Sequence, residues 1–239
     1  MNLVERGGLR LLQFPSLEAA GVQCAVSTRP LDVKDRAQRD RFVAALGLDP
    51  ERVVSPRQMH HAQVAEIGDK TPEPLQVDGL ITRTPGVPLT LRAADCSLIV
   101  VVDPRKGALG VAHAGWKGSA RGIVVQLVDE MERVWGIDPA GCLAAIGPTI
   151  SQNRYPVGEE VPASFLRHRS WASQYVKVEK KTIYFDLAGV NRHFLLESGL
   201  APDNIETCDL CTFDNEELLH SFRRDGTGAG HHGLVAALT

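Results

Sequence analysis

The sequence predicts an α/β fold with a mixed sheet. Apolar, β-branched runs that are typical of buried strands alternate with segments whose apolar residues recur at helical spacing. The composition is ordinary for a globular protein, with 44% hydrophobic and 23% charged residues. The 239 residues show no internal repeat and no flexible stretch long enough to link two domains. We therefore expect residues 1–239 to form a single domain.

The first predicted helix spans residues 36–46, and Gly47 follows it where a helix should end. Two proline-containing segments come next along the chain. Residues 71–74 (TPEP) are typical of a loop, and residues 84–88 (TPGVP) are typical of a turn. Both segments are too short to separate two domains.

Two buried strands are predicted in the middle of the chain. Ser97–Asp103 is a continuous β-branched run closed by Pro104, and Ala108–His113 is a second apolar run. After the turn AGWKG we expect Ser119 to cap a helix that ends at Gly136. The helical spacing is carried by Ile123, Leu127, Met131 and Val134.

Two more strands and one helix are predicted in the second half. Leu143–Ile146 is a short apolar run that stops at Gly147. Ile183–Asp186 is another, and Asp186 is placed to cap a helix that ends near Gly199. The apolar face of that helix carries Leu187, Val190 and Phe194.

Charge and cysteine content exclude several classes of protein. With 26 Lys and Arg against 29 Asp and Glu, the net charge of −3 excludes a strongly basic binder of nucleic-acid polymers or membrane surfaces. Five cysteines, an odd number, argue against a secreted disulfide scaffold. Glu5 and Arg6 interrupt any signal peptide, and the longest apolar run, Leu98–Val102, is far shorter than a membrane span. We expect a cytoplasmic protein with reduced thiols.

Several familiar motifs do not account for this chain. It contains no GxxxxGK[ST], GxSxG or HExxH motif. The glycine-rich segment 226–230 follows a predicted helix rather than a strand, which favours a flexible turn over a dinucleotide site. The pair Cys208 and Cys211 lacks a second ligand pair with zinc-finger spacing and lacks a thioredoxin-like unit. We interpret it as two buried cysteines at a strand end.

Three residues at predicted strand ends form a candidate metal site. His60 lies in a strand-to-loop region, Cys96 directly precedes the strand Ser97–Asp103, and His113 ends the next strand. Ligands gather at strand ends in α/β sheets, and two imidazoles with one thiolate suit zinc while leaving a fourth position open. Their spacing is not specific, so ordinary structural histidines remain the alternative.

A series of short motifs resembles one known family. In order, they are QMH (58–60), ADC (94–96), VAHAGWKG (111–118), IGPTIS (146–151), VGEEV (157–161), CT (211–212) and SFRRDG (221–226). The chain is similar to the YfiH-like family, also described as laccase-domain polyphenol oxidases, peptidoglycan editing factors and purine nucleoside phosphorylases. The resemblance implies layered mixed β-sheets flanked by helices, similar to the cytotoxic necrotizing factor-like fold. It also implies one zinc ion on His60, Cys96 and His113.

The resemblance further implies an enzyme acting on small molecules. The expected reaction is phosphorolysis of adenosine, inosine or methylthioadenosine, with adenosine deaminase as a side activity. Zinc bound to the three ligands supplies a Lewis acid or an activated water. The expected partners are a nucleoside and phosphate, and we expect a monomer or a weak homodimer.

Other residues are candidates for binding substrate beside the metal. Arg223 and Arg224 are candidate phosphate ligands, with a surface salt-bridge cluster as the alternative. Lys117 and Ser119 could place backbone amides for phosphate at a helix N-terminus. Asp95 is expected to orient a histidine ligand or, alternatively, to cap a turn. Cys211, which matches the family pattern, is also expected to bind substrate.

The chain departs from the family pattern at two places, and other functions stay open. Pro156 replaces the usual acidic residue of YEVG, and relatives commonly carry an arginine in a TGR segment after RRDG, where this chain has the run TGAG followed by His231 and His232. Hydrolytic editing of a UDP-muramyl-amino acid is one alternative function. A copper-dependent polyphenol oxidase is another, although adventitious copper at the same site would explain weak oxidation. A zinc-stabilised binding module would need a fourth ligand such as His61 or Cys211.

Overall fold

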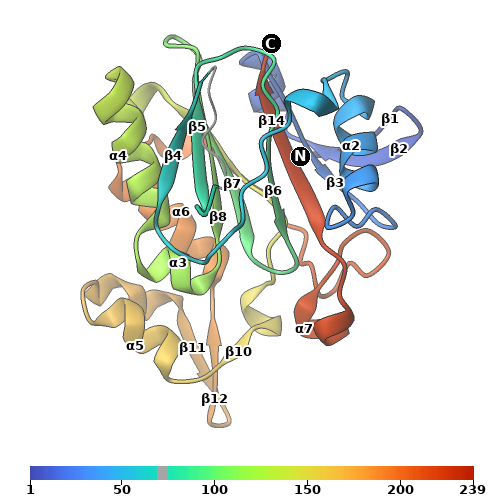
Figure 1. The fold of residues 1–239 in the computed structure, drawn as a ribbon. Coiled ribbons are helices and arrows are strands. Elements are labelled where there is room, and N and C mark those ends of the chain that lie inside the picture. The colour runs from blue at the N-terminus through green and yellow to red at the C-terminus, as the bar shows by residue number, and fades with distance from the viewer. Residues whose placement is uncertain (69–74) are drawn as a thin grey trace.

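The computed structural model describes residues 1–68 and 75–239 (Figure 1). The loop predicted at 71–74 lies outside these residues, and the turn predicted at 84–88 is present at Pro85 and Gly86. The α/β fold is confirmed, with sheets and helices in layers. Within the described ranges no helix is both long and apolar enough to cross a bilayer.

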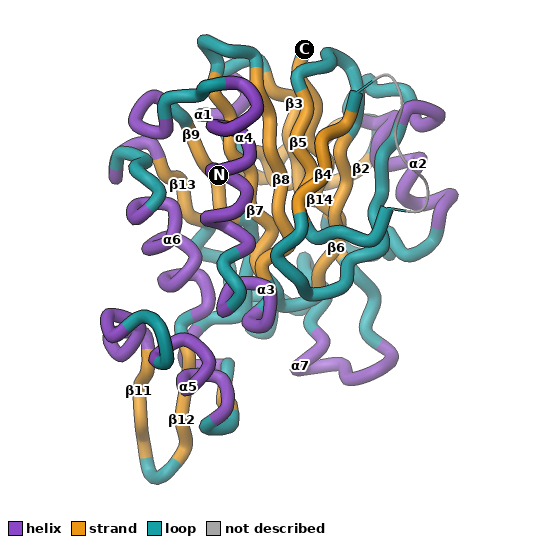
Figure 2. Tube along the Cα trace, turned by 60° about the vertical axis from the view of Figure 1, so that its left-hand side comes forward, coloured by secondary structure: helices purple, strands orange, loops and turns teal. Residues whose placement is uncertain are grey.

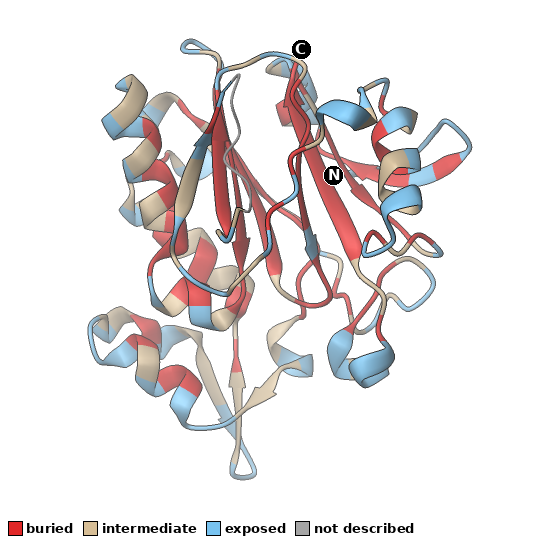
Figure 3. Ribbon diagram, in the orientation of Figure 1, coloured by how far each residue is buried: buried red, intermediate tan, exposed pale blue. Residues whose placement is uncertain are grey.

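Four layers stack on one another (Figure 1). Helices α4 (Ile123–Trp135) and α6 (Leu187–Glu197) cover one face of a six-stranded sheet. The other face of that sheet packs against a five-stranded sheet. Helix α2 (Arg36–Ala45) covers the outer face of the five-stranded sheet. In Figure 3 the strands of both sheets are largely buried, as this layering requires.

The six-stranded sheet has the order β13-β9-β7-β8-β5-β4. The pairs β13–β9 and β4–β5 are parallel, and the others are antiparallel, so the sheet is mixed as predicted. Its strands are β4 (Val64–Ile67), β5 (Gly79–Thr82), β7 (Ser97–Asp103), β8 (Ala108–Ala114), β9 (Leu143–Ile146) and β13 (Ile205–Thr207).

The five-stranded sheet is antiparallel, with the order β1-β2-β3-β14-β6. A three-stranded sheet of order β10-β12-β11 projects with α5 from one end of the layers (Figure 2). The strands of these two sheets are β1 (Asn2–Arg6), β2 (Leu9–Gln13), β3 (Val22–Ser27), β6 (Leu89–Ala93), β14 (His232–Leu238), β10 (Pro156–Val157), β11 (Val176–Glu179) and β12 (Thr182–Phe185).

The predicted helix ends are confirmed by backbone geometry. The φ values are positive at all three predicted ends: 74° at Gly47, 59° at Gly136 and 94° at Gly199. Glycine adopts this left-handed region without strain because it has no Cβ. Asp186 caps α6 by accepting the Gly189 N–H at 2.9 Å. The remaining helices are α1 (Pro15–Ala19), α3 (Trp116–Ala120), α5 (Glu160–Leu166) and α7 (Phe222–Asp225), with 3₁₀ turns at Pro50–Arg52, Pro139–Gly141, Gln152–Arg154, Ser170–Tyr175, Pro202–Asn204 and Gly226–Gly228.

Strand β7 contributes side chains to two separate cores. Ile99 and Val101 pack under α4 and α6. Leu98, Val100 and Val102 pack between the two large sheets. Successive side chains of a strand point to opposite faces, so a strand buried on both faces has no polar alternation. This explains the unbroken apolar run that the sequence shows.

The expected cap at Ser119 is wrong. The chain enters α3 directly after β8, with Gly115 as its cap residue, and α4 begins separately after Gly122. Ser119 lies inside α3, fully buried, and its hydroxyl donates to Asn191 Oδ1 at 2.7 Å. The hydroxyl therefore faces the core, and the Ser119 backbone N–H, which was expected to bind phosphate, donates to the Gly115 carbonyl at 2.9 Å.

His232, at the start of β14, is buried in an unusual way. Neither of its ring nitrogens has a hydrogen-bond partner within the described part of the chain. Burial, reinforced by nearby His220 and His231, lowers the pKa of His232 to about 3. The folded protein therefore keeps this ring neutral at pH values where an unfolded histidine, with its pKa near 6.5, is already protonated.

This difference predicts a loss of stability in acid. As the pH falls from the unfolded pKa toward the folded one, His232 lowers the free energy of unfolding by about 1.4 kcal/mol per pH unit. Denaturant unfolding across this range should show a shallower pH dependence for His232→Leu than for the wild type. The exposed His168→Gln serves as the control. An equal pH dependence of the free energy of unfolding in His232→Leu and the wild type would contradict the lowered pKa of His232.

Candidate metal centre

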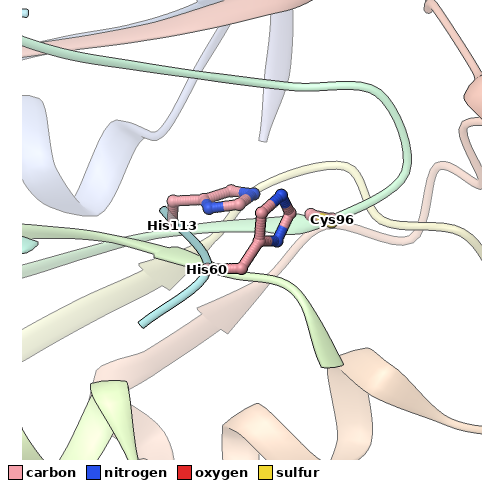
Figure 4. Close-up of side chains that lie close together, drawn as sticks. All are labelled: His60, Cys96 and His113. Atoms are coloured by element: carbon pink, nitrogen blue, oxygen red, sulfur yellow. The ribbon is translucent and has the colours of Figure 1, made fainter. Parts of the chain in front are cut away.

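The structure brings His60, Cys96 and His113 together (Figure 4). His60 comes from the loop before β4, Cys96 from the turn before β7, and His113 from the end of β8. Their candidate ligand atoms all lie within 4.8 Å of one another. No other group of three His, Cys, Asp or Glu side chains meets this condition in the described ranges. Two imidazoles and a thiolate fit a zinc ion with one open position.

Asp78 organises this group and was not predicted. Its carboxylate is fully buried, and Oδ1 lies 2.9 Å from His113 Nδ1. It also accepts the backbone N–H groups of Met59, His60 and His61, at 2.8 to 3.0 Å. The bond to Nδ1 leaves Nε2 of His113 as the metal-facing nitrogen. The only sequence signal was an aspartate directly before a short apolar strand.

Two further contacts fix His60 beside Cys96. The backbone of His60 is left-handed, with φ of 58°, and its carbonyl accepts a hydrogen bond from Arg121 Nη1 at 2.6 Å. Gly115 provides the close approach of the ligands, because a Cβ there would lie 2.8 Å from Cys96 Sγ and 3.1 Å from His60 Nδ1. Any larger residue at this position would therefore displace a ligand.

The charges of the site favour an ionised carboxylate beside a basic imidazole. Burial opposes ionisation of Asp78, but hydrogen bonds from His113 and from the backbone of His61 and Met59 lower its pKa overall. Burial also opposes protonation of His113, yet the bond to Asp78 and the proximity of Cys96 raise its pKa to about 9. Burial and the charge of His113 lower the pKa of His60.

The three candidate ligands line a cavity of about 540 Å³. Its walls combine planar aromatic side chains with cationic ones. Phe222, which is 54% exposed, presents a large apolar ring to this cavity. The aromatic residues are Trp116, Tyr155 and Phe222, and the cationic ones are Arg92, Lys117 and Arg223.

Arg223 and Arg224 differ in their availability. The Arg223 guanidinium lies over the Tyr155 ring, 5.1 Å from its centroid, and donates to the Pro156 carbonyl at 2.6 Å. It remains exposed and lines the cavity. Arg224 instead bonds the Asp225 carboxylate and three backbone carbonyls, those of Thr212, Phe213 and Leu219. The proposed phosphate role of Arg224 is therefore corrected to a structural one.

Asp95 does not orient a histidine, which corrects the first of its two expected roles. Its Oδ1 accepts the Thr212 hydroxyl at 2.5 Å, and its Oδ2 accepts the backbone N–H of Arg223 at 2.7 Å. With φ of 93°, it occupies the turn before β7. Asp95 thus positions the segment that carries Arg223, and the carboxylate that contacts a histidine ligand is that of Asp78.

Cys211 is not one of the candidate ligands and lies outside the lining of the metal cavity. It is buried, its Sγ accepts the Ser151 N–H at 3.3 Å, and it lines a separate cavity of about 410 Å³. Cys208 follows β13 directly and is also buried and free, as expected for cysteines at a strand end. Neither Cys211 nor His61 belongs to the group of candidate ligands.

The two departures from the family pattern are connected to the metal cavity in different ways. Pro156 contributes the carbonyl that holds Arg223. His231 lines the cavity, and burial together with Lys34 and Arg92 lowers its pKa to about 4. Sequence position alone did not show that His231 lines this cavity, or that Pro156, 75 positions earlier, holds a cation of its wall.

Comparison with known proteins agrees with the motifs. Residues 14–239 match a family model described as multi-copper polyphenol oxidoreductase laccase. A purine nucleoside phosphorylase of Deinococcus radiodurans is 32% identical, over 97% of this chain and 94% of its own length. Adenosine deaminase RL5, from an unknown prokaryotic organism, is 34% identical over 77% of this chain and 74% of its own.

The fold also matches a solved structure. The crystal structure of YlmD from Geobacillus stearothermophilus superposes with a TM-score of 0.88 and 26% identity, covering 100% of this chain and 98% of that one. The layered fold is thus shared along nearly the whole chain. The protein belongs to the family described as multi-copper polyphenol oxidoreductase laccase, whose YfiH-like members its motifs resemble.

Proposed function

We propose that this protein is a zinc-dependent purine nucleoside phosphorylase. Its substrates are adenosine, inosine and methylthioadenosine, and adenosine deaminase is a side activity. The observation that carries the proposal is the composition of the metal cavity, which joins soft metal donors, aromatic walls and exposed cations in about 540 Å³. The names of the relatives, a phosphorylase and a deaminase, support the same assignment.

The cavity offers separate surfaces for the two reactants. Lys117, Arg92 and Arg223 provide cationic donors for inorganic phosphate, and arginine can bind phosphate through two parallel hydrogen bonds. Phe222 and Trp116 provide flat apolar surfaces on which a purine can stack. Both surfaces border the same three candidate ligands, so phosphate and nucleoside can meet there.

In phosphorolysis, a phosphate oxygen forms a bond to C1′ of the ribose while the bond from C1′ to the purine nitrogen breaks. The electron pair passes to the base, which needs a hydrogen-bond donor or a proton. Burial raises the pKa of Tyr155, so its hydroxyl stays protonated and can donate to the departing base. A zinc ion held by His60, Cys96 and His113 would supply a Lewis acid that stabilises developing negative charge.

An oxidase that uses several copper ions is less well supported. Such enzymes need a further histidine cluster for dioxygen chemistry. Residues 1–68 and 75–239 contain one candidate metal group, with three ligands. Copper taken up there would give weak oxidation of phenols rather than a complete laccase.

The test is incubation of zinc-loaded protein with adenosine, inosine or methylthioadenosine, with and without phosphate, followed by product identification. Release of free base and a ribose 1-phosphate only with phosphate is the expected result. Inosine formed from adenosine without phosphate would reveal the deaminase activity. No turnover of any nucleoside, together with hydrolysis of a UDP-muramyl-amino acid, would overturn the proposal.

A variant pair sharpens this test. Arg223→Gln should raise the KM for phosphate by roughly tenfold, since a charge-assisted hydrogen bond is lost. Arg133→Gln is the control, because Arg133 is exposed on α4 and pairs with Glu130. An equal effect of both changes would show that the loss reflects overall charge and not binding by Arg223.

A further inference from the structure

A second cavity, of about 670 Å³, adjoins the metal cavity. It lies where α3 packs near α5 and the turn that follows α5 (Figure 1). The two cavities share Trp116 and Lys117 in their walls. The second cavity contains none of the candidate metal ligands, and nothing in the proposed reaction uses its remaining walls.

This second cavity is lined by an excess of positive charge. Its cationic or basic residues are Lys117, Arg121, Arg167, His168 and Arg169, against a single acidic residue, Glu160. Arg167 and His168 are exposed at the turn after α5. For a chain whose net charge is −3, this local excess is far from the average composition.

The protein does not neutralise these cations. Arg121 donates to the His60 carbonyl, and Arg169 donates to the Ala120 carbonyl and lies over the Phe194 ring. Among the described residues, no carboxylate lies within 4.0 Å of the charged nitrogens of these two or of Lys117 and Arg167. Like charges gathered in one concave surface raise its positive potential, which an anionic ligand relieves.

We propose that this cavity binds a ligand that carries a chain of two or more phosphate groups. A single phosphate would meet only some of the cations and would leave most of the 670 Å³ empty. A phosphate chain can contact arginines at several points, and arginine binds phosphate through paired hydrogen bonds. Trp116 offers an additional aromatic face for a planar part of the ligand.

The phosphate chain has two possible sources. In the first case, the phosphate chain is part of a nucleotide whose nucleoside enters the metal cavity across the shared wall. In the second case, it is part of a separate effector, and the metal cavity is filled independently. Both sources use the same cations. Adenosine competition separates them, and that arm alone rests on the proposed function.

The experiment measures binding of ADP and adenosine by isothermal titration calorimetry. The test variant is Arg167→Gln with His168→Gln, because both side chains are exposed and neither contacts the metal ligands. Arg121 is avoided because it also holds His60. The control is the exposed Arg133→Gln on α4.

The wild type should bind ADP more tightly than adenosine, and the double variant should weaken ADP binding by roughly tenfold or more. The Arg133 control should bind ADP as the wild type does. If the phosphate chain belongs to a nucleotide that spans both cavities, saturating adenosine should weaken ADP binding. If it belongs to a separate effector, saturating adenosine should leave ADP binding unchanged. If adenosine does not bind, the comparison of ADP binding between the wild type, the double variant and the Arg133 control alone tests the proposed phosphate site.

Three results would overturn the proposal: ADP binding no tighter than adenosine, unchanged ADP binding in the double variant, or an equal loss in the Arg133 control. Nucleoside turnover without added ADP is measured in parallel. A protein that cleaves adenosine but fails the ADP test loses only the second site. One that binds ADP through Arg167 but cleaves no nucleoside loses only the proposed function.

Discussion

Cys96→Ala should lose its metal and lower kcat/KM by roughly a thousandfold, because a metal Lewis acid contributes several kcal/mol to transition-state stabilisation. The fold should survive. Cys96 lies in a turn at the cavity wall and is only half-buried, so alanine leaves no large void in either core. Metal content by mass spectrometry and circular dichroism would check both statements.

The matched control is Cys208→Ala. Cys208 is also a free cysteine next to a strand, but it lies outside the candidate metal group. This variant should keep its metal and its activity. Unchanged metal content in Cys96→Ala would show that the ligand assignment is wrong, whatever the effect on turnover.

Asp78→Asn should weaken zinc binding by about 10- to 100-fold and destabilise the protein by about 3 kcal/mol. The wild-type carboxylate accepts three backbone N–H groups and faces His113 Nδ1. An amide of the same shape replaces one acceptor oxygen with a donor NH₂, which must face an N–H group. Competition with a zinc chelator and denaturant unfolding measure the two effects.

Asp103→Asn is the control for Asp78→Asn. Asp103 is equally buried and accepts two backbone N–H groups after β7, but it lies away from the metal cavity. The substitution Asp103→Asn should lower the free energy of unfolding without changing metal affinity.

The effect of Asp78 on stability should also depend on pH. Because the folded pKa of Asp78 is lowered, the stabilisation that its carboxylate provides is present above the unfolded pKa and is lost as the pH falls. A metal affinity unaffected by Asp78→Asn would contradict its orienting role.

Most of the elements around the site could be predicted because their signals are local. The strands β7, β8 and β9 are unbroken apolar runs, and glycines end α2, α4 and α6. The cap of α4 was misplaced because Ser119 has the chemistry of a cap but bonds instead to Asn191, 72 residues away. A buried partner at that distance leaves no mark in the local pattern.

The candidate site could be predicted only in its outline. Strand-end positions and the family motifs identified His60, Cys96 and His113 without their supports. Asp78 and Arg121 were missed because a hydrogen bond to a backbone loop has no sequence signature. Adjacent arginines looked equivalent in sequence, yet the carbonyls after Cys211 bind Arg224 and leave Arg223 in the cavity.

The contacts around Asp78 bear on how the protein acquires its metal. His113 is held by a strand ladder and a carboxylate, and the loop of His60 by three backbone N–H groups that donate to Asp78 and by Arg121, so the polypeptide itself sets the spacing of the donors. We therefore expect that a metal bound there would exchange without unfolding of the chain. Such a rigid pair of imidazoles with a thiolate binds Cu²⁺ more tightly than Zn²⁺ by intrinsic affinity. We therefore expect the metal held at such a site to depend on the supply of each metal, with copper bound where copper is abundant.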